Sequence, residues 1–216
     1  MQAEPHALEE LRRLGVPAVP AVALGNRAAH GWNPPAYAAL LGVPFEAEVK
    51  LSPGTLASRL DVVLGAAGDL LRHLPDAHLD HVPPERARTL RDLGFHVFRL
   101  SLAFTEAMDA GRLPYAWLGE TAPADMRASS AVANYGALVR ARLAGWFEGT
   151  PPVEYARSVE AYYGPQSGHD LLERTVWHAA QHLRQLYTLA ERLGVKPLTP
   201  MPVDAFRGLP LPDALW

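Results

Sequence analysis

The sequence predicts a mainly α-helical protein, a four-helix bundle preceded by a small α-β-β-α segment. After residue 53, long stretches repeat apolar side chains with helical spacing. Proline, glycine and asparagine residues stand at the boundaries of these stretches, as expected for helix starts and stops. Before residue 45, a short helical pattern is joined to a run rich in valine and alanine, which favours strands.

The first 45 residues form the smaller predicted unit. Residues 5–15 have the pattern of an amphipathic helix, and residues 16–24 that of a buried strand. A Gly-Asn turn signal separates that strand from a returning strand over 27–32. Asn33 is a suitable cap for a helix over 36–41. This segment therefore reads as helix, strand, strand, helix.

The larger predicted unit covers residues 53–200, and a proline-rich tail over 201–216 follows it. Apolar spacing predicts its four helices at 55–74, 85–109, 129–147 and 170–193. The connections 112–128 and 149–168 are predicted to be loops. Four helices of this length with two long connections indicate an antiparallel or a crossover four-helix bundle.

Composition narrows the classes of function. The net charge is −3 and no basic stretch stands out, so nucleic acid is not an expected partner. No apolar run is long enough to span a membrane, and the N-terminus lacks the pattern of a secretory signal, so we expect a cytoplasmic protein. The chain has no cysteine. A metal site must therefore use histidine or carboxylate ligands.

The strongest local motif is the pair His178 and His182 in the last predicted helix. Residues four apart lie on one face of a helix, so both imidazoles can reach one ion. Ala179 stands where an HExxH metalloprotease has its glutamate, which excludes that class. Taken alone, the pair is equally consistent with one buried and one solvated histidine.

A third histidine favours the metal interpretation. His96 lies among apolar residues on the inward side of the second predicted helix, where a polar ring needs a partner. Bundle cores are known to hold metal sites built from facing helices. Three imidazoles leave coordination positions open for water or substrate, as in catalytic sites. We therefore predict one divalent ion, with zinc, nickel and iron(II) all compatible.

Residues 53–200 resemble the DinB/YfiT-like family of metal-binding four-helix bundles. The resemblance rests on Leu60-Asp61 with Leu64, on the stretch from Thr89 to His96, and on the stretch from Leu172 to Leu186. The three ligands of the family match His96, His178 and His182 one for one. The resemblance thus implies the same fold and the same ligand set.

The resemblance also implies a reaction class. Characterised members include thiol-dependent S-transferases and isomerases, which act with a small thiol such as mycothiol or bacillithiol. We therefore expect a small-molecule substrate and a low-molecular-weight thiol cosubstrate. A metal-assisted hydrolase and a non-enzymatic metal-binding stress-response module remain alternatives, and a homodimer is expected.

Three further residues are candidates for supporting roles at the metal site. Asp92, one turn before His96, could accept the second ring N–H of that histidine, or it could cap the helix. Gln181 lies beside the ligand pair. Arg184 is a candidate for binding an anionic cosubstrate, with a surface salt bridge as the alternative.

Residues 5–43 resemble the C-terminal half of a glutaredoxin or thioredoxin-like domain. The resemblance rests on the Val-Pro at 19–20, the Gly-Asn turn and the stretch from Gly31 to Pro34. It makes Pro20 a candidate cis-proline. The strand and the Cys-x-x-Cys helix that should precede this half are missing, so no redox activity is expected. An unrelated α-β-β-α extension is the alternative.

Overall fold

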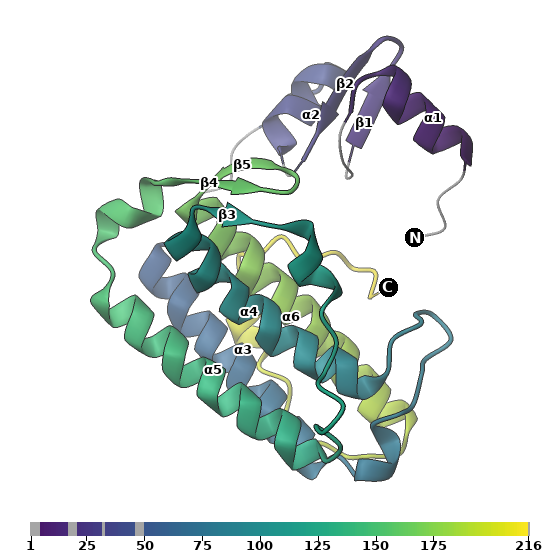
Figure 1. Ribbon diagram of the computed structural model, residues 1–216, viewed down its shortest axis with the longest axis vertical. Coiled ribbons are helices and arrows are strands. Elements are labelled where there is room, and N and C mark those ends of the chain that lie inside the picture. Colours follow the sequence, from purple (N-terminus) through teal and green to yellow (C-terminus); the bar gives the residue numbers. More distant parts are fainter. Residues whose placement is uncertain (1–4, 17–20, 32, 46–49, 216) are drawn as a thin grey trace.

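The computed structural model describes all residues except 1–4, 17–20, 32, 46–49 and 216. Four long helices form an elongated bundle, and a small segment with a hairpin and two short helices sits at one end (Figure 1). The mainly helical class predicted from the sequence is confirmed.

The bundle consists of α3 (Pro53–His73), α4 (Leu90–Ala110), α5 (Ser129–Gly149) and α6 (Gly168–Arg192). Three of the four starts and all four ends lie within about two residues of the prediction. The exception is α4, which begins at Leu90 rather than at residue 85. Thr89 caps this helix by accepting a hydrogen bond from the Asp92 N–H at 3.0 Å, and the residues before it form turns.

The bundle has a crossover arrangement. Both α3 and α4 pack against α5 and α6, whereas α3 and α4 themselves share few contacts. The two helices that follow each other in the chain therefore lie diagonally across the bundle. The leucine-rich faces of all four meet in one apolar core. This arrangement places α4 beside α6, which the metal prediction requires.

The two predicted loops contain a small sheet that sequence analysis missed. Strand β3 (Arg112–Leu113) pairs in parallel with β4 (Ser158–Ala161), and β4 pairs antiparallel with β5 (Gly164–Ser167). Short 3-10 helices occur at Tyr115–Gly119 and Pro152–Ala156. Strands of two to four residues with glycine and proline do not produce a clear alternating pattern. The sheet lies at the bundle end that faces the N-terminal segment.

The N-terminal segment has the predicted order of elements. It contains α1 (Pro5–Arg13), the antiparallel strands β1 (Ala21–Leu24) and β2 (Arg27–His30), and α2 (Pro34–Leu41). Asn33 caps α2, as predicted. The thioredoxin resemblance itself stays a hypothesis, and Pro20 lies outside the described residues.

Gly31 brings the N-terminal segment against the small sheet. Its φ of +81° favours glycine, and a Cβ atom at this position would lie 2.1 Å from the Tyr163 carbonyl oxygen. The Tyr37 hydroxyl donates a hydrogen bond to the Gly31 carbonyl. Only a residue without a side chain permits this approach.

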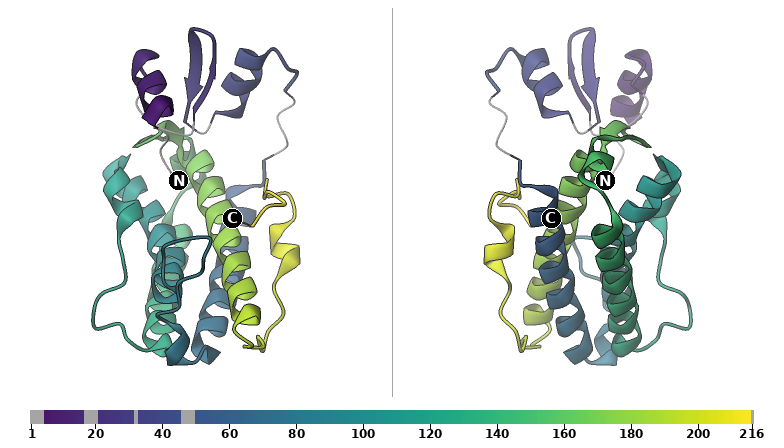
Figure 2. Two further views of the ribbon diagram at one scale, coloured as in Figure 1. Left: turned by 90° about the vertical axis from the view of Figure 1, so that its right-hand side faces the viewer. Right: turned by 90° about the vertical axis from the view of Figure 1, so that its left-hand side faces the viewer.

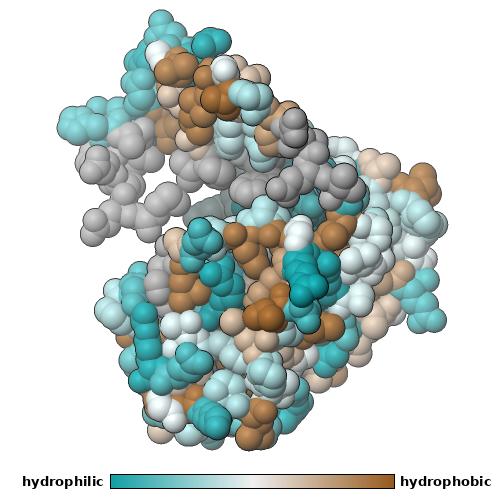
Figure 3. Space-filling model, turned by 180° about the vertical axis from the view of Figure 1, so that it is seen from behind, coloured by the Kyte–Doolittle hydropathy of each residue, from teal (hydrophilic) through white to brown (hydrophobic). Residues whose placement is uncertain are grey.

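The chain after α6 turns back along the bundle. It includes a 3-10 helix at Val203–Phe206 and continues beside α6 to residue 215 (Figure 2). Within the described residues, no helix is long and apolar enough to cross a membrane. On the face seen in Figure 3, hydrophobic residues form patches separated by hydrophilic ones.

Candidate metal centre

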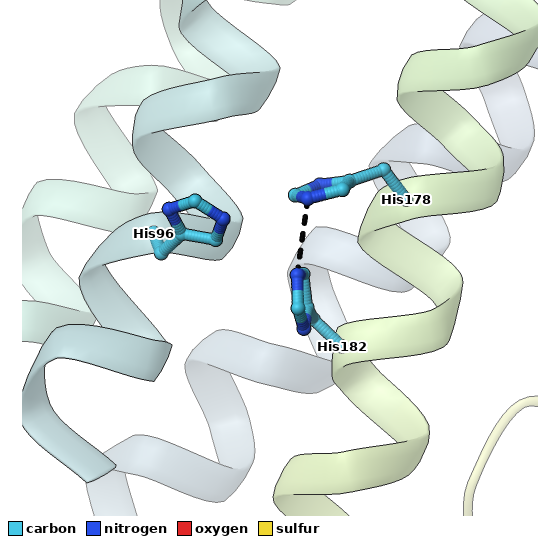
Figure 4. A group of neighbouring side chains, drawn as sticks. All are labelled: His96, His178 and His182. Carbon is cyan, nitrogen blue, oxygen red and sulfur yellow. Dashed lines mark hydrogen bonds between the residues drawn. The ribbon is translucent and has the colours of Figure 1, made fainter. Parts of the chain in front are cut away.

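His96, His178 and His182 come together between α4 and α6 (Figure 4). Their candidate ligand atoms all lie within 4.8 Å of one another. The ring centroid of His96 is 5.1 Å from that of each partner, and the two α6 rings are 4.3 Å apart. The structure therefore assembles the predicted ligand set from two helices that are distant in sequence.

The two histidines of α6 are already spaced as ligands of one ion. Their Nε2 atoms are 3.0 Å apart. Two nitrogens that are each about 2.0–2.1 Å from a shared zinc ion lie roughly 3 Å apart in common geometries. The i, i+4 spacing therefore brings both rings to one point without distortion of the helix.

His96 supports the same interpretation from the opposite helix. Its side chain is only 5% exposed, and its Nδ1 atom is buried without a hydrogen-bond partner in the part of the chain that the structure describes. A buried polar atom without a partner is unfavourable unless something satisfies it. Figure 4 shows the other ring nitrogen, Nε2, on the side of the α6 pair, so Nε2 is the atom that would bind a shared divalent ion. The fit to the predicted ion therefore rests on the convergence of the three imidazoles.

All three imidazoles favour the neutral form that binds metal. Burial is the main cause of the lowered pKa in each case and nearby positive charge adds to it, whereas the Gln185 hydrogen bond opposes it at His182. The pKa of His96 falls to about 2 and that of His182 to about 4, while the pKa of His178 lies well below its usual range. The Arg88 side chain contributes to all three shifts. Protons therefore compete weakly for these ligands near neutral pH.

Gln185 is the support residue that sequence analysis missed. Its Oε1 lies 2.6 Å from His182 Nδ1, and its side chain is fully buried. The amide oxygen accepts, so Nδ1 carries the proton and Nε2 presents its lone pair to the centre. Its position three residues after His182 was the available signal, since such residues share a helix face.

The structure gives the three predicted support residues other partners. Asp92 accepts hydrogen bonds from the Thr89 hydroxyl and from the Ala122 N–H, so its carboxylate supports the Thr89 cap of α4 and binds the loop that contains Ala122. This is the capping alternative, and the expected bond to His96 is not formed. The cause is local, because the Thr89 cap holds the carboxylate at the helix start.

Gln181 and Arg184 face the C-terminal tail instead of the ligands. Gln181 donates to the carbonyls of Ala214 and Leu215, at 3.1 and 2.9 Å. Arg184 donates to Gln181 Oε1 and to the carbonyls of Pro212 and Asp213. The Arg184 guanidinium therefore binds backbone carbonyls, and its expected use for a cosubstrate is not supported by its position.

A largely apolar pocket adjoins the centre. Its volume is about 460 Å³ including the part open to solvent, and His178 forms part of its wall. The other lining residues come from α4, α6 and the small sheet with its flanking 3-10 helix: Leu100, Ala103, Phe104, Leu113, Leu118, Tyr162, Tyr163, Leu171, Arg174 and Thr175. A metal ligand thus borders a space suited to a small molecule.

Arg174 and Tyr163 supply much of the polarity of this pocket. The guanidinium of Arg174 lies 4.2 Å from the centre of the Tyr163 ring. Burial raises the pKa of Tyr163 to about 12, so its hydroxyl stays protonated. No aspartate or glutamate is among the described residues that line the pocket.

The fold and the histidine cluster define a helical bundle with a candidate three-histidine metal centre. A sequence profile of the DinB superfamily matches residues 27–186. The chain belongs to the DinB superfamily. The matched range includes β2 and α2, so it does not follow the predicted boundary near residue 45.

Two solved structures from Bacillus subtilis are similar to this chain. The DinB-like protein YjoA is 17% identical, with a TM-score of 0.54 over 68% of this chain and 96% of its own. YfiT, described as a probable metal-dependent hydrolase with an unusual four-helix bundle topology, is 14% identical, with a TM-score of 0.57 over 71% and 96%. No curated protein matches the chain. At these identities the likeness establishes the fold.

Proposed function

We propose that this protein is an enzyme that binds one divalent metal ion through His96, His178 and His182. The observation that carries the proposal is the convergence of three neutral imidazoles beside an apolar pocket. Three protein ligands leave open positions, the arrangement of catalytic rather than structural sites. The imidazole set suits zinc, nickel or iron(II).

The preferred reaction is transfer or isomerisation with a small thiol cosubstrate. A bound divalent ion would lower the pKa of a coordinated thiol and so supply a nucleophile at neutral pH. The chain has no cysteine, so the sulfur must come from a second molecule. The positive charge of Arg88, which lowers the pKa of all three histidines, would also favour a thiolate.

The residues of the pocket would bind and orient the substrate. Its leucine and phenylalanine walls suit an apolar portion of the substrate. The lack of a carboxylate among the described lining residues leaves no evident general base for activating water. A thiol depends less on such a base, because its pKa is already near neutrality.

The second candidate is a metal-assisted hydrolase. The similarity to YfiT, itself described as a probable metal-dependent hydrolase, favours this alternative. Here a water molecule would take the open position and act as the nucleophile. A metal-binding module without catalytic activity is the remaining outcome. We also propose that the protein is a cytoplasmic homodimer. Analytical sedimentation would measure its oligomeric state.

The first experiment is metal analysis of protein purified without chelator. We expect about one divalent ion per chain in wild type and none in His182→Ala. The matched control is His73→Ala, which removes an exposed histidine of α3 that bonds to the Asp69 carbonyl. Wild-type protein that neither retains nor takes up a stoichiometric ion would contradict the proposal.

The second experiment separates the two reactions. Thermal shifts of metal-loaded protein are measured with bacillithiol, mycothiol and glutathione, because a specific ligand stabilises the folded state. Conjugation of each thiol to monochlorobimane is compared with hydrolysis of p-nitrophenyl esters without thiol. Thiol-dependent shift and conjugation support the transferase. Ester hydrolysis alone, with no shift by any thiol, supports the hydrolase.

A further inference from the structure

One face of α6 is a docking surface for the C-terminal segment of residues 210–215. Trp177, Gln181 and Gln185 are four residues apart, and Arg184 follows Gln181 by three, so the four side chains share one side of the helix. Their side chains donate hydrogen bonds to the backbone carbonyls of Pro210, Pro212, Asp213, Ala214 and Leu215. The docking surface therefore recognises the backbone of the tail.

Gln185 belongs both to this docking surface and to the metal centre. Its Nε2 donates to the Leu215 carbonyl at 2.7 Å, and its Oε1 faces His182 Nδ1 at 2.6 Å. A carbonyl can only accept, so the amide nitrogen must face the tail. The amide oxygen must then face the histidine and accept from it. The tail carbonyl thus fixes the orientation of the Gln185 amide.

This orientation determines which nitrogen of His182 is free to bind metal. With the oxygen facing it, Nδ1 carries the proton and Nε2, 3.0 Å from His178 Nε2, keeps its lone pair. Without the Leu215 carbonyl, the amide could turn and present its N–H groups to Nδ1. That would favour the tautomer with a proton on Nε2, which cannot bind the ion.

We propose that the docked segment 210–215 is part of the metal centre, and that Gln185 is the positioning residue through which tail docking and metal affinity are coupled. This inference rests on the proposed metal binding. Coupling between two sites is reciprocal, so a docked tail raises metal affinity and a bound ion holds the tail in place by the same factor. The tail acts through His182 and does not touch the ion.

Three variants test the coupling, with Co²⁺ or Zn²⁺ affinity measured by competition with a chromophoric chelator. Gln185→Met removes both hydrogen bonds, and we expect affinity to fall about 10- to 100-fold, the usual effect of losing the partner of a histidine ligand. Gln185→Glu keeps an acceptor for Nδ1 and should recover most of this loss. Gln181→Met loosens the tail but leaves the Gln185 contact to His182 in place, so its loss should be smaller than that of Gln185→Met.

The effect of the bound ion on tail docking is tested by digestion of the C-terminus with carboxypeptidase, followed by mass spectrometry. Addition of the ion should slow digestion of wild type and should have little effect on digestion of Gln185→Met. Equal rates with and without the ion in wild type that binds metal, or wild-type affinity in Gln185→Met, would overturn the inference. Wild type that binds no ion at all would instead overturn the proposed function.

Discussion

The two sides of the metal centre hold their ligands by different means. On α6, His182 is oriented by a hydrogen bond from Nδ1 to Gln185, and its Nε2 is 3.0 Å from that of His178. On α4, the Nδ1 atom of His96 has no partner among the described residues. Packing places His96, because its neighbours Phe95 and Val97 are buried in the bundle.

This difference indicates how the centre would work. The α6 pair is preorganised by the helix and by a side-chain amide, so it can bind an ion with little rearrangement. His96 has no such support on Nδ1 among the described residues, and it would bind the ion through Nε2, the nitrogen on the side of the α6 pair. His178 and His182 of α6 should therefore contribute most of the metal affinity, and His96 of α4 should add the third ligand.

Substitution of the ligands should have the largest effect. His182→Ala should lower metal affinity by more than about 100-fold, because loss of a ligand exceeds the 10- to 100-fold effect of losing its hydrogen-bond partner. His96→Ala should leave a weaker site formed by the α6 pair. Isothermal titration with Zn²⁺ measures both. A larger loss in His96→Ala than in His182→Ala would reverse the comparison.

The metal-free protein should lose stability as the pH falls. The three pKa values are lowered in the folded state, so the unfolded chain binds these protons first. The contribution is complete above pH 6.5 and is lost progressively as pH falls toward about 4, where His182 titrates in the fold. The expected slope is at most about 1.4 kcal/mol per pH unit for each histidine. Urea unfolding of chelator-treated protein measures it.

The matched variant for this pH dependence is His182→Gln in the same chelator-treated state. It should show a shallower decline in unfolding free energy between pH 6.5 and pH 4. Identical slopes in the variant and in wild type would show that His182 does not contribute to the loss.

The α4 side is expected to be sensitive to packing. Phe98, two residues after His96, lies against Gly136 of α5, where an added Cβ would be 2.4 Å from the ring. Gly136→Ala should therefore destabilise the fold by about 1–3 kcal/mol. The control is Gly145→Ala in the same helix, where nothing lies within 4 Å and about 0.5–1 kcal/mol of stabilisation is expected. Thermal unfolding measures the stability of both variants. Equal changes in stability would contradict close packing between Phe98 and Gly136.

The smallest effect is expected at Asp92, whose carboxylate bonds to Thr89 and to the Ala122 N–H. Asp92→Ala should reduce stability by about 1 kcal/mol, the typical value for a lost helix-terminal hydrogen bond. Metal affinity should stay at the wild-type value, because the carboxylate does not reach His96. A clear loss of affinity would restore the support role predicted from the sequence.

Sequence patterns predicted those parts of the fold that depend on local signals. The predicted Asn33 cap is formed at the start of α2, and Gly111, which has a φ of +69°, ends α4 as glycine is favoured to do. The start of α4 was placed too early because residues 85–88 are compatible with a helix, whereas tertiary contacts hold them in turns. Glu85, for example, accepts a hydrogen bond from Arg192 of α6 at 2.6 Å.

The three histidine ligands could be predicted from the sequence, but the residue that orients His182 could not, because its role depends on contacts between distant parts of the chain. His178 and His182 are linked by a helical repeat, and the apolar setting of His96 is visible in the sequence. The role of Gln185 depends on the Leu215 carbonyl, whose position depends on how the tail returns along α6. Similarly, the small sheet forms only when β3 meets β4, more than one helix later in the chain.

The diagonal placement of α3 and α4 has a consequence for the order of folding. A helix hairpin formed early from these two consecutive helices would not contain the native contacts, since each packs mainly on α5 and α6. His96 meets its partners only after the chain through α6 has been made and the connection between them has closed, a step that costs entropy. An ion that requires all three histidines can therefore bind only after α6 has joined the fold. Metal uptake by a refolding chain would then mark the end of bundle assembly rather than its beginning.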